Sequence, residues 1–272
     1  MKVSIAQLDI ERGDPETNLD RIGKSAAEAA AQGAELLCLP EMATTGFDWE
    51  RNRELLKACG QHHQQLSEIA RTHRIALCGS YLEEAPSGKA ANTLIYHDAT
   101  GLERARYRKM HLFTLFREHE HVEAGDSIVT ADLGAFKAGF AICYDLRFPE
   151  LFRRNMEAGA ALQILPAAFP HPRLEHWRTL LRARAIENQC FFIGVNQCGF
   201  ERHGASVGQT RYFGHSMVID PWGEILAEAG EEAVVLTFDL DLDLVERVRK
   251  KMPSLVDRRP DLYGKRACGQ AD

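Results

Sequence analysis

Three short segments of this 272-residue sequence each place one reactive side chain at or just beyond the end of a predicted buried strand. The side chains are those of Glu41, Lys109 and Cys143. A carboxylate can accept and return a proton, an amine can carry positive charge, and a thiolate is a strong nucleophile. Because open α/β sheets place their active sites beyond strand ends, this combination indicates a catalytic site.

Each segment also has a purely structural interpretation. A cysteine in an apolar run is most often a small buried hydrophobe, and we interpret Cys38 and Cys78 in that way. A glutamate after a strand can be a helix cap or a surface charge, and Lys109 follows basic residues that can all be solvated. The three segments together favour catalysis more strongly than any one of them.

The apolar periodicity predicts that alternating strands and helices position these residues. In the first half, Asp14 followed by Pro15 is typical of a helix start, and Gly33 of its end. A hairpin with its turn at residues 98–101 favours a mixed sheet over a purely parallel one. The predicted elements are a strand at 3–8, a helix ending at 33, strands at 36–39 and 75–79 around a helix at 64–72, and hairpin strands at 93–96 and 103–107.

The second half repeats this alternation. The turn at 220–223 indicates a second hairpin, and Pro253 stops the last helix. We find no linker, repeat or change of composition, so we expect one α/β domain over 1–272 with a polar tail at about 264–272. The predicted elements are strands at 136–143, 162–165, 191–195, 216–219, 224–227 and 233–238, and helices at 149–158, 174–188 and 242–252.

The composition is that of a globular protein that binds small molecules. Lys and Arg number 33 against 39 Asp and Glu, a formal charge of −6, so no basic surplus favours nucleic acid or an anionic membrane as partner. No apolar stretch is long enough to span a bilayer. The chain enters its first strand without an apolar leader, and its seven cysteines form no C-x-x-C pair, so we expect a reducing cytoplasm.

Common cofactor and hydrolase motifs are missing. The sequence has no G-x-G-x-x-G after a strand, no G-x-x-x-x-G-K-[ST], no H-E-x-x-H and no G-x-S-x-G. His119 and His121 flank one residue in a charged loop, and we expect them to be solvated rather than to ligate metal. We therefore expect neither a metal nor an organic cofactor.

Three motifs resemble the signatures of the nitrilase superfamily, the carbon-nitrogen hydrolases. They are Pro40-Glu41-Met42-Ala43-Thr44-Thr45-Gly46-Phe47, Arg108-Lys109-Met110-His111-Leu112-Phe113 and Cys143-Tyr144-Asp145-Leu146-Arg147-Phe148-Pro149-Glu150. Their order and spacing agree with the family over nearly the whole chain. The resemblance implies a four-layer αββα sandwich with mixed sheets, a triad of Glu41, Lys109 and Cys143, and a homodimer.

Many members of that family carry a second glutamate after the lysine. Glu118, Glu120 and Glu123 all precede Ala124-Gly125-Asp126, which resembles the family landmark that follows this glutamate. Counting back seven residues from Gly125, as in the amidase branch, gives Glu118, and Glu120 remains the alternative.

The triad that the resemblance implies meets the chemical needs of amide hydrolysis. Cys143 would attack the carbonyl carbon and form a thioester, while Glu41 takes the thiol proton, passes it to the leaving ammonia and then activates water. We expect Lys109 to lower the thiol pKa and, with the backbone N–H of Tyr144, to bind the oxyanion. Glu118 would hold Lys109 charged or position the substrate amide.

Further stretches resemble the ω-amidase branch, including Pro166-Ala167-Ala168-Phe169, His176-Trp177 and Gly214-His215-Ser216. That likeness implies a short dicarboxylate monoamide, such as α-ketoglutaramate or succinamate, as substrate. Its free carboxylate would need a bidentate arginine, for which we nominate Arg173. Arg147 is the alternative, unless it pairs with Asp145 or Glu150, and Phe169 is a further candidate for substrate contact.

Other functions remain open at this point. On the same fold, the chain could hydrolyse N-carbamoyl compounds or nitriles. A non-catalytic interaction protein could keep the fold, although the intact triad argues against it. A metal-dependent amidohydrolase would instead use His111, His119 and His121.

Overall fold

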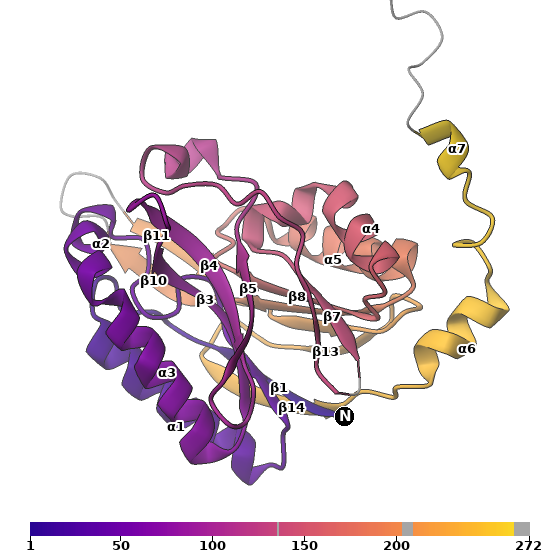
Figure 1. Cartoon of the computed structure of the whole chain (residues 1–272). Coiled ribbons are helices and arrows are strands. Elements are labelled where there is room, and N and C mark those ends of the chain that lie inside the picture. Colours follow the sequence, from indigo (N-terminus) through magenta and orange to yellow (C-terminus); the bar gives the residue numbers. More distant parts are fainter. Residues whose placement is uncertain (135, 203–208, 264–272) are drawn as a thin grey trace, which may run out of the picture.

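Two six-stranded sheets form the body of the protein (Figure 1). The computed structural model describes residues 1–134, 136–202 and 209–263, so the predicted polar tail lies outside the described residues. The first sheet has the order β14 (Val234–Asp239), β1 (Lys2–Gln7), β2 (Leu36–Cys38), β3 (Ala76–Glu84), β4 (Ala90–His97) and β5 (Glu103–Arg108). The second has β13 (Ile225–Glu228), β12 (Met217–Ile219), β9 (Phe191–Asn196), β8 (Leu162–Ala167), β7 (Lys137–Phe140) and β6 (Thr130–Asp132).

Each sheet has three parallel strands in its middle and antiparallel strands at its edges. In the first sheet β1, β2 and β3 are parallel, and in the second β7, β8 and β9 are parallel. The other pairings within both sheets are antiparallel, including the predicted hairpins β4–β5 and β12–β13. A separate antiparallel pair is formed by β10 (Cys198–Arg202) and β11 (Gln209–Phe213).

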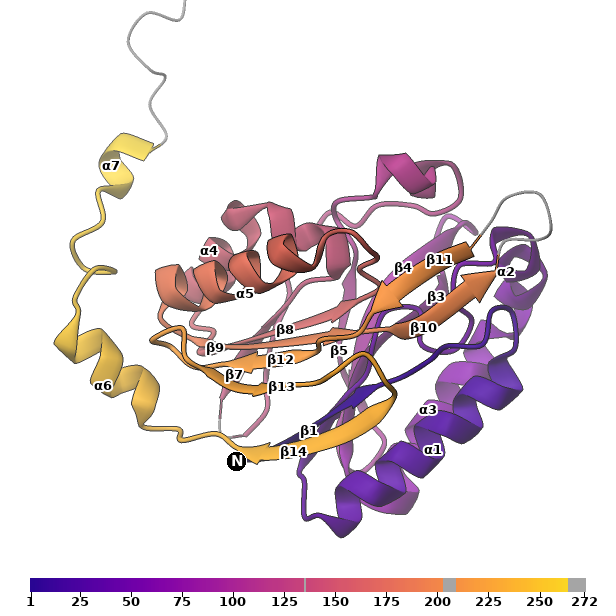
Figure 2. The same cartoon turned by 180° about the vertical axis from the view of Figure 1, so that it is seen from behind.

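The parallel strands are apolar on both faces because both faces are covered. In β2, Leu36 and Cys38 belong to the core between the two sheets, whereas Leu37 belongs to the core under the helices. Helices α1 (Pro15–Ala31) and α3 (Cys59–His73) cover the first sheet, and α4 (Pro149–Glu157) and α5 (Leu174–Asn188) cover the second (Figure 2). The expected αββα sandwich with mixed sheets is confirmed.

Shorter helices complete the chain. They are α2 (Trp49–Leu55), α6 (Leu244–Lys251), α7 (Pro260–Tyr263) and the 3-10 helices η1 (Leu56–Ala58), η2 (Thr114–Phe116), η3 (Glu118–Glu120) and η4 (Cys143–Arg147). In Figure 1, α6 and α7 extend away from the sandwich. None of the helices in the described part of the chain has the length and apolar character that crossing a membrane requires.

One predicted strand ends earlier than expected, and several observed elements were not predicted. The strand predicted at 136–143 ends at Phe140, and a 3-10 helix begins at Cys143. The apolar run continues past the strand because its side chains remain buried, and periodicity reports burial rather than backbone conformation. The sequence analysis did not predict α2, β6, β10 or β11.

The strand directions bring the reactive segments to one end of the sandwich, beyond the ends of the strands. β5 is antiparallel to β4, which is antiparallel to β3, so β5 runs in the direction of β2 and β3. The residues that follow β2 and β5 therefore leave the first sheet at the same end of its strands. A bond from the backbone N–H of Glu41 to the carbonyl of Ala167 (3.4 Å) joins this end to the end of β8 in the second sheet.

The strand that leads to Cys143 tolerates no side chain at Gly139. A Cβ at this position would lie 2.5 Å from Cβ of Asn155 and 2.7 Å from Oε1 of Gln163. We expect Gly139→Ala to lower the free energy of unfolding by about 1–3 kcal/mol, measured by denaturant titration. The matched control is Gly23→Ala in α1, where a Cβ meets no atom within 4 Å and removing a helical glycine is expected to stabilise. Equal stability of Gly139→Ala and the unmodified chain would contradict this packing.

Candidate active site

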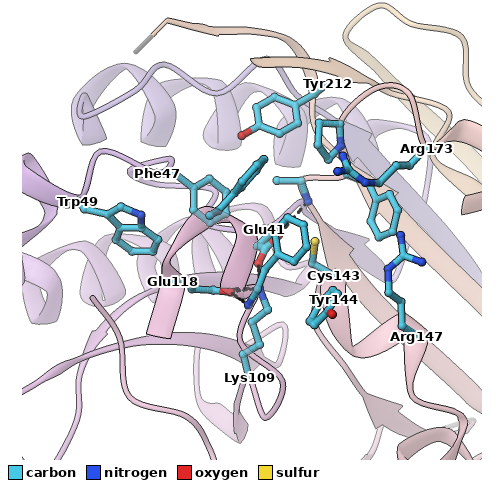
Figure 3. Close-up of a pocket in the computed structure, with 15 residues that line it drawn as sticks. Glu41, Phe47, Trp49, Lys109, Glu118, Cys143, Tyr144, Arg147, Arg173 and Tyr212 are labelled. Carbon is cyan, nitrogen blue, oxygen red and sulfur yellow. Dashed lines mark hydrogen bonds and ion pairs between the residues drawn. The ribbon is translucent and has the colours of Figure 1, made fainter. Parts of the chain in front are cut away.

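The side chains of Glu41, Lys109 and Cys143 converge at the seam between the two sheets (Figure 3). Lys109 Nζ lies 2.8 Å from Glu41 Oε1. Cys143 and Glu41 line the same pocket, and their side chains lie close enough to shift each other's pKa. Glu41 and Lys109 are 1% and 2% exposed, so the cluster is shielded from bulk water.

Glu118, rather than Glu120, is the second glutamate at the lysine. Its Oε1 and Oε2 atoms lie 2.9 and 2.8 Å from Lys109 Nζ. Glu120 instead pairs with Arg117 on the surface. The loop holds Glu118 in place because the backbone N–H of Phe113 donates to its Oε2 atom at 2.7 Å.

The turn that carries Cys143 is held in an uncommon backbone conformation. Cys143 has φ of +46°, which places a non-glycine residue in the left-handed region. Asp145 fixes this turn, because its Oδ2 atom accepts the N–H of Ile142 at 2.8 Å and the hydroxyl of Tyr107 at 2.7 Å. Its Oδ1 atom accepts the N–H of His111. The suggested pairing of Arg147 with Asp145 or Glu150 was therefore wrong.

Lys109 lowers the pKa of Cys143 as expected, but burial and Glu41 outweigh it, so the net shift favours the neutral thiol. Burial raises the pKa of Cys143 well above that of a free cysteine, and the negative Glu41 raises it further. Lys109 acts in the opposite direction without reversing the shift. Burial also raises the pKa of Glu41, although Lys109 opposes this. Together these shifts favour a thiol that gives up its proton to Glu41 only as it reacts.

Lys109 remains a cation despite its burial. Desolvation lowers the pKa of a buried amine, but Glu118 and Glu41 outweigh it, so the pKa of Lys109 is raised well above its ordinary value. The ammonium has three N–H groups, and the three short contacts to the two carboxylates match them. In this state, the donors of Lys109 are fully used.

Two backbone N–H groups lie close to the thiol. Tyr144 is the second residue of η4, so its N–H precedes the first hydrogen bond of that helix, which runs from Asp145 to Ile142. The N–H of Ala168 donates to Glu41 Oε2 at 2.9 Å. The N–H of Ala168 also acts on the Cys143 thiol and lowers its pKa.

An aromatic pocket of about 470 Å³, its open mouth included, leads to the cluster. The nominated Arg147, Arg173 and Phe169 all line it. The other lining residues are Glu41, Phe47, Trp49, Lys109, Phe113, Phe116, Glu118, Cys143, Tyr144, Ala168, Pro170 and Tyr212.

Both pocket arginines stack on aromatic rings. The guanidinium carbon of Arg147 lies 5.4 Å from the ring centre of Phe169, and that of Arg173 lies 5.8 Å from the ring centre of Phe113. Across the described residues, neither side chain forms an ion pair with a carboxylate. Two cationic groups in the pocket wall are thus available to an anionic ligand.

The sequence analysis missed several residues of the site. Asn92 in β4 donates to Glu41, and the hydroxyl of Tyr212 in the pocket wall donates to Glu201 at 2.6 Å. Trp49 begins the unpredicted helix α2 and stacks on His121. A polar residue inside an apolar strand, as in the stretch 90–97, is the signal that could have indicated Asn92.

The histidines of the alternative metal site have other partners. His111 Nδ1 lies 2.7 Å from Asp145 Oδ1, His121 stacks on Trp49, and His119 lies beside Glu120. Within 1–134, 136–202 and 209–263, no three His, Cys, Asp or Glu side chains form a group that could hold a metal ion.

Comparisons with known proteins identify the family. The carbon-nitrogen hydrolase model matches residues 2–250. The chain is 37% identical to a 2-oxoglutaramate amidase from Bacillus subtilis (strain 168) over 96% of this chain and 98% of that protein. It is 33% identical to an omega-amidase from Homo sapiens, over 96% of each chain.

A solved structure agrees with the fold. An amidase from Nesterenkonia sp. AN1, in which acrylamide has undergone Michael addition at the active site cysteine, superposes with a TM-score of 0.82. The two are 29% identical, over 94% of this chain and 99% of that one. The resemblance noted in the sequence is therefore confirmed, and this chain belongs to the carbon-nitrogen hydrolase family, the hydrolases of carbon–nitrogen bonds.

Proposed function

We propose that the protein is a thiol-dependent amidase that hydrolyses a short dicarboxylate monoamide to the diacid and ammonia. The observation that carries this proposal is the convergence of Cys143, Glu41 and the buried Lys109 in one pocket, with Lys109 bonded to Glu41. The amidase names of the relatives support the reaction class. The 2-oxoglutaramate amidase among them supports a substrate such as α-ketoglutaramate.

In the first half-reaction, Glu41 accepts the thiol proton while the sulfur of Cys143 forms a bond to the carbonyl carbon. The oxygen of the tetrahedral intermediate becomes negative and is bound by the N–H of Tyr144 and by Lys109. Glu41 then passes its proton to the nitrogen, the C–N bond breaks, and ammonia leaves a thioester on Cys143.

In the second half-reaction, Glu41 removes a proton from water, and the hydroxyl oxygen attacks the thioester carbon. The C–S bond breaks, the acid leaves, and Glu41 returns its proton to the sulfur of Cys143. One carboxylate thus serves both half-reactions, and no proton is gained or lost by the enzyme over the cycle.

Lys109 must exchange a partner in order to bind the oxyanion. Its three N–H groups are directed at Glu41 and Glu118 in the resting site. Glu118 keeps the N–H of Phe113 as a donor when Lys109 releases one of its oxygens. We assign Glu118 the role of holding Lys109 charged and close to the reacting carbonyl.

The free carboxylate of the substrate is assigned to the arginine side of the pocket. Arg173 and Arg147 line the pocket, and arginine binds carboxylates through two parallel hydrogen bonds. Arg173 is our first candidate, Arg147 the second, and Phe169 supports the guanidinium of Arg147 by stacking.

We also propose a cytoplasmic location and a homodimer as the working assembly. The six cysteines that the structure describes are free and buried, which suits a reducing compartment. The substrate is the only partner that the pocket requires.

Replacing the nucleophile tests the central assignment. We expect Cys143→Ala and Cys143→Ser to abolish ammonia release from succinamate and α-ketoglutaramate, because no other thiol lines the pocket among the described residues. The folded state should persist, as judged by circular dichroism. Cys59→Ala, which changes a buried cysteine outside the pocket, serves as the control. Near-normal ammonia release by Cys143→Ala would refute the mechanism.

The acid-base cluster predicts a specific pH dependence. Glu41 must be ionised to accept the thiol proton, and its raised pKa means that kcat/KM falls with acidification at a pH above the ordinary range of glutamate. Glu41→Gln and Lys109→Ala should each lower kcat by roughly 10³-fold or more. A pH–rate profile without an acid limb above pH 4.5, the ordinary pKa of glutamate, would argue against Glu41 as the base.

Substrate selectivity tests the arginine assignment. We expect Arg173→Ala to raise KM for succinamate about tenfold or more, and to change KM little for an uncharged amide of equal length, because only the former loses a bidentate ion pair. Arg182→Ala, on the helix that begins directly after Arg173 but outside the pocket, is the matched control. Equal effects on the two amides would remove Arg173 from the carboxylate site. A panel with ureido acids and nitriles separates the other reactions of this fold.

A further inference from the structure

Asn92 is a buried side chain that touches both carboxylates of the active site. It lies in β4 and is 1% exposed. Its Nδ2 atom donates to Glu41 Oε1 at 2.8 Å and to Glu118 Oε1 at 3.3 Å. Its own carbonyl accepts the backbone N–H of Lys109 at 2.9 Å. Asn92 is therefore bonded to all three charged residues of the cluster.

A hydrogen bond to the oxygen of the Asn92 amide fixes the orientation of the amide. Asn92 Oδ1 accepts the hydroxyl of Ser80 at 2.8 Å, and the Ser80 oxygen in turn accepts the N–H of Met42 at 3.0 Å. Because ionised carboxylates only accept hydrogen bonds, the nitrogen of the amide must face the two glutamates. A flipped amide would place oxygen against oxygen and leave the Ser80 hydroxyl without its acceptor.

The two oxygens of the Glu41 carboxylate have different hydrogen-bond partners. Oε1 is bonded to Lys109 and Asn92, and Oε2 to the N–H of Ala168. Without Asn92, only the flexible stem of Lys109 would hold Oε1 and only the Ala168 N–H would hold Oε2, so the carboxylate would turn more freely about its terminal bond, whose torsion is broad. The short, buried side chain of Asn92 removes this freedom.

We propose that Asn92 is a positioning residue whose amide nitrogen, shared between Glu41 and Glu118, fixes the Glu41 carboxylate against the Cys143 thiol. This inference rests on the proposed function, because it assigns Asn92 an effect on the general base. Asn92 does not line the pocket, so it acts on Glu41 and not on bound substrate.

The proposal has a consequence for pH dependence. Glu41 faces Lys109 after β5, Glu118 in η3, Cys143 in η4 and Tyr212 in β11. The Asn92 amide adds a donor that favours the ionised carboxylate. Its removal therefore raises the pKa of Glu41, and the acid limb of kcat/KM moves to higher pH.

The experiment measures kcat, KM and the pH profile of kcat/KM for Asn92→Ala and Asn92→Leu, the second of which keeps the volume of the side chain. We expect kcat to fall about tenfold to a hundredfold at pH 7, as loss of a hydrogen bond to a charged group predicts, with KM unchanged. The acid limb should move to higher pH. Ser80→Ala, which frees the amide to reorient and also removes the acceptor of the Met42 N–H, should lower kcat by about three- to tenfold and move the limb in the same direction.

The matched control is Asn155→Ala. Asn155 is also fully buried and also donates from one nitrogen to two acceptors, Phe140 O and Gln163 Oε1, away from the pocket. Its loss should lower thermal stability and leave the pH profile unchanged.

An unshifted acid limb in folded Asn92→Leu overturns the proposal, and so does a change in KM alone. If both Asn92 variants fail to fold, Ser80→Ala decides, since an unshifted limb there overturns the proposal equally. Glu41→Gln and Cys143→Ala separate this result from the proposed function. Activity retained in those two variants refutes the mechanism itself, whereas their inactivity beside normal Asn92 variants refutes only the role of Asn92.

Discussion

A single buried ammonium group, shared by two carboxylates, is the interaction on which the site depends. Lys109, Glu41 and Glu118 lie where water is excluded, so each charge would be costly without its partners. The two carboxylates carry one negative charge more than the ammonium balances, and neutral hydrogen-bond donors stabilise this excess charge. The N–H groups of Phe113 and Ala168 and the Asn92 amide supply them.

These donors come from both halves of the molecule, and the charged cluster therefore ties the sheets together. Glu41 follows β2 of the first sheet, yet its side chain accepts the N–H of Ala168, which follows β8 of the second. Its carbonyl accepts the side chain of Gln197, also from the second half. The same bonds that stabilise the carboxylate thus set the distance between the sheets at the end where the active site lies.

The features that could be predicted from the sequence are local patterns and motifs shared with a known family. Glu41, Lys109 and Cys143 could be predicted because each lies at or just beyond the end of a predicted strand, and the motifs around them implied the fold. The raised pKa of Cys143 could not be predicted, because it depends on burial in the folded site and on the negative Glu41, which lies far away along the chain. Asn92 was missed for a related reason, since periodicity assigns a polar residue in a strand to solvent.

The division of the site between two sheets has a consequence for the chain during its synthesis. Residues 1–118 already include the lysine and both glutamates, but the thiol and the N–H of Ala168 arrive only with β7 and β8. A nascent chain that has made only β1 to β5 carries no nucleophile beside its base, and β14, the last strand of the first sheet, follows the whole second sheet in the sequence. Turnover begins only when the halves have docked, so hydrolytic activity is itself a gauge of completed folding.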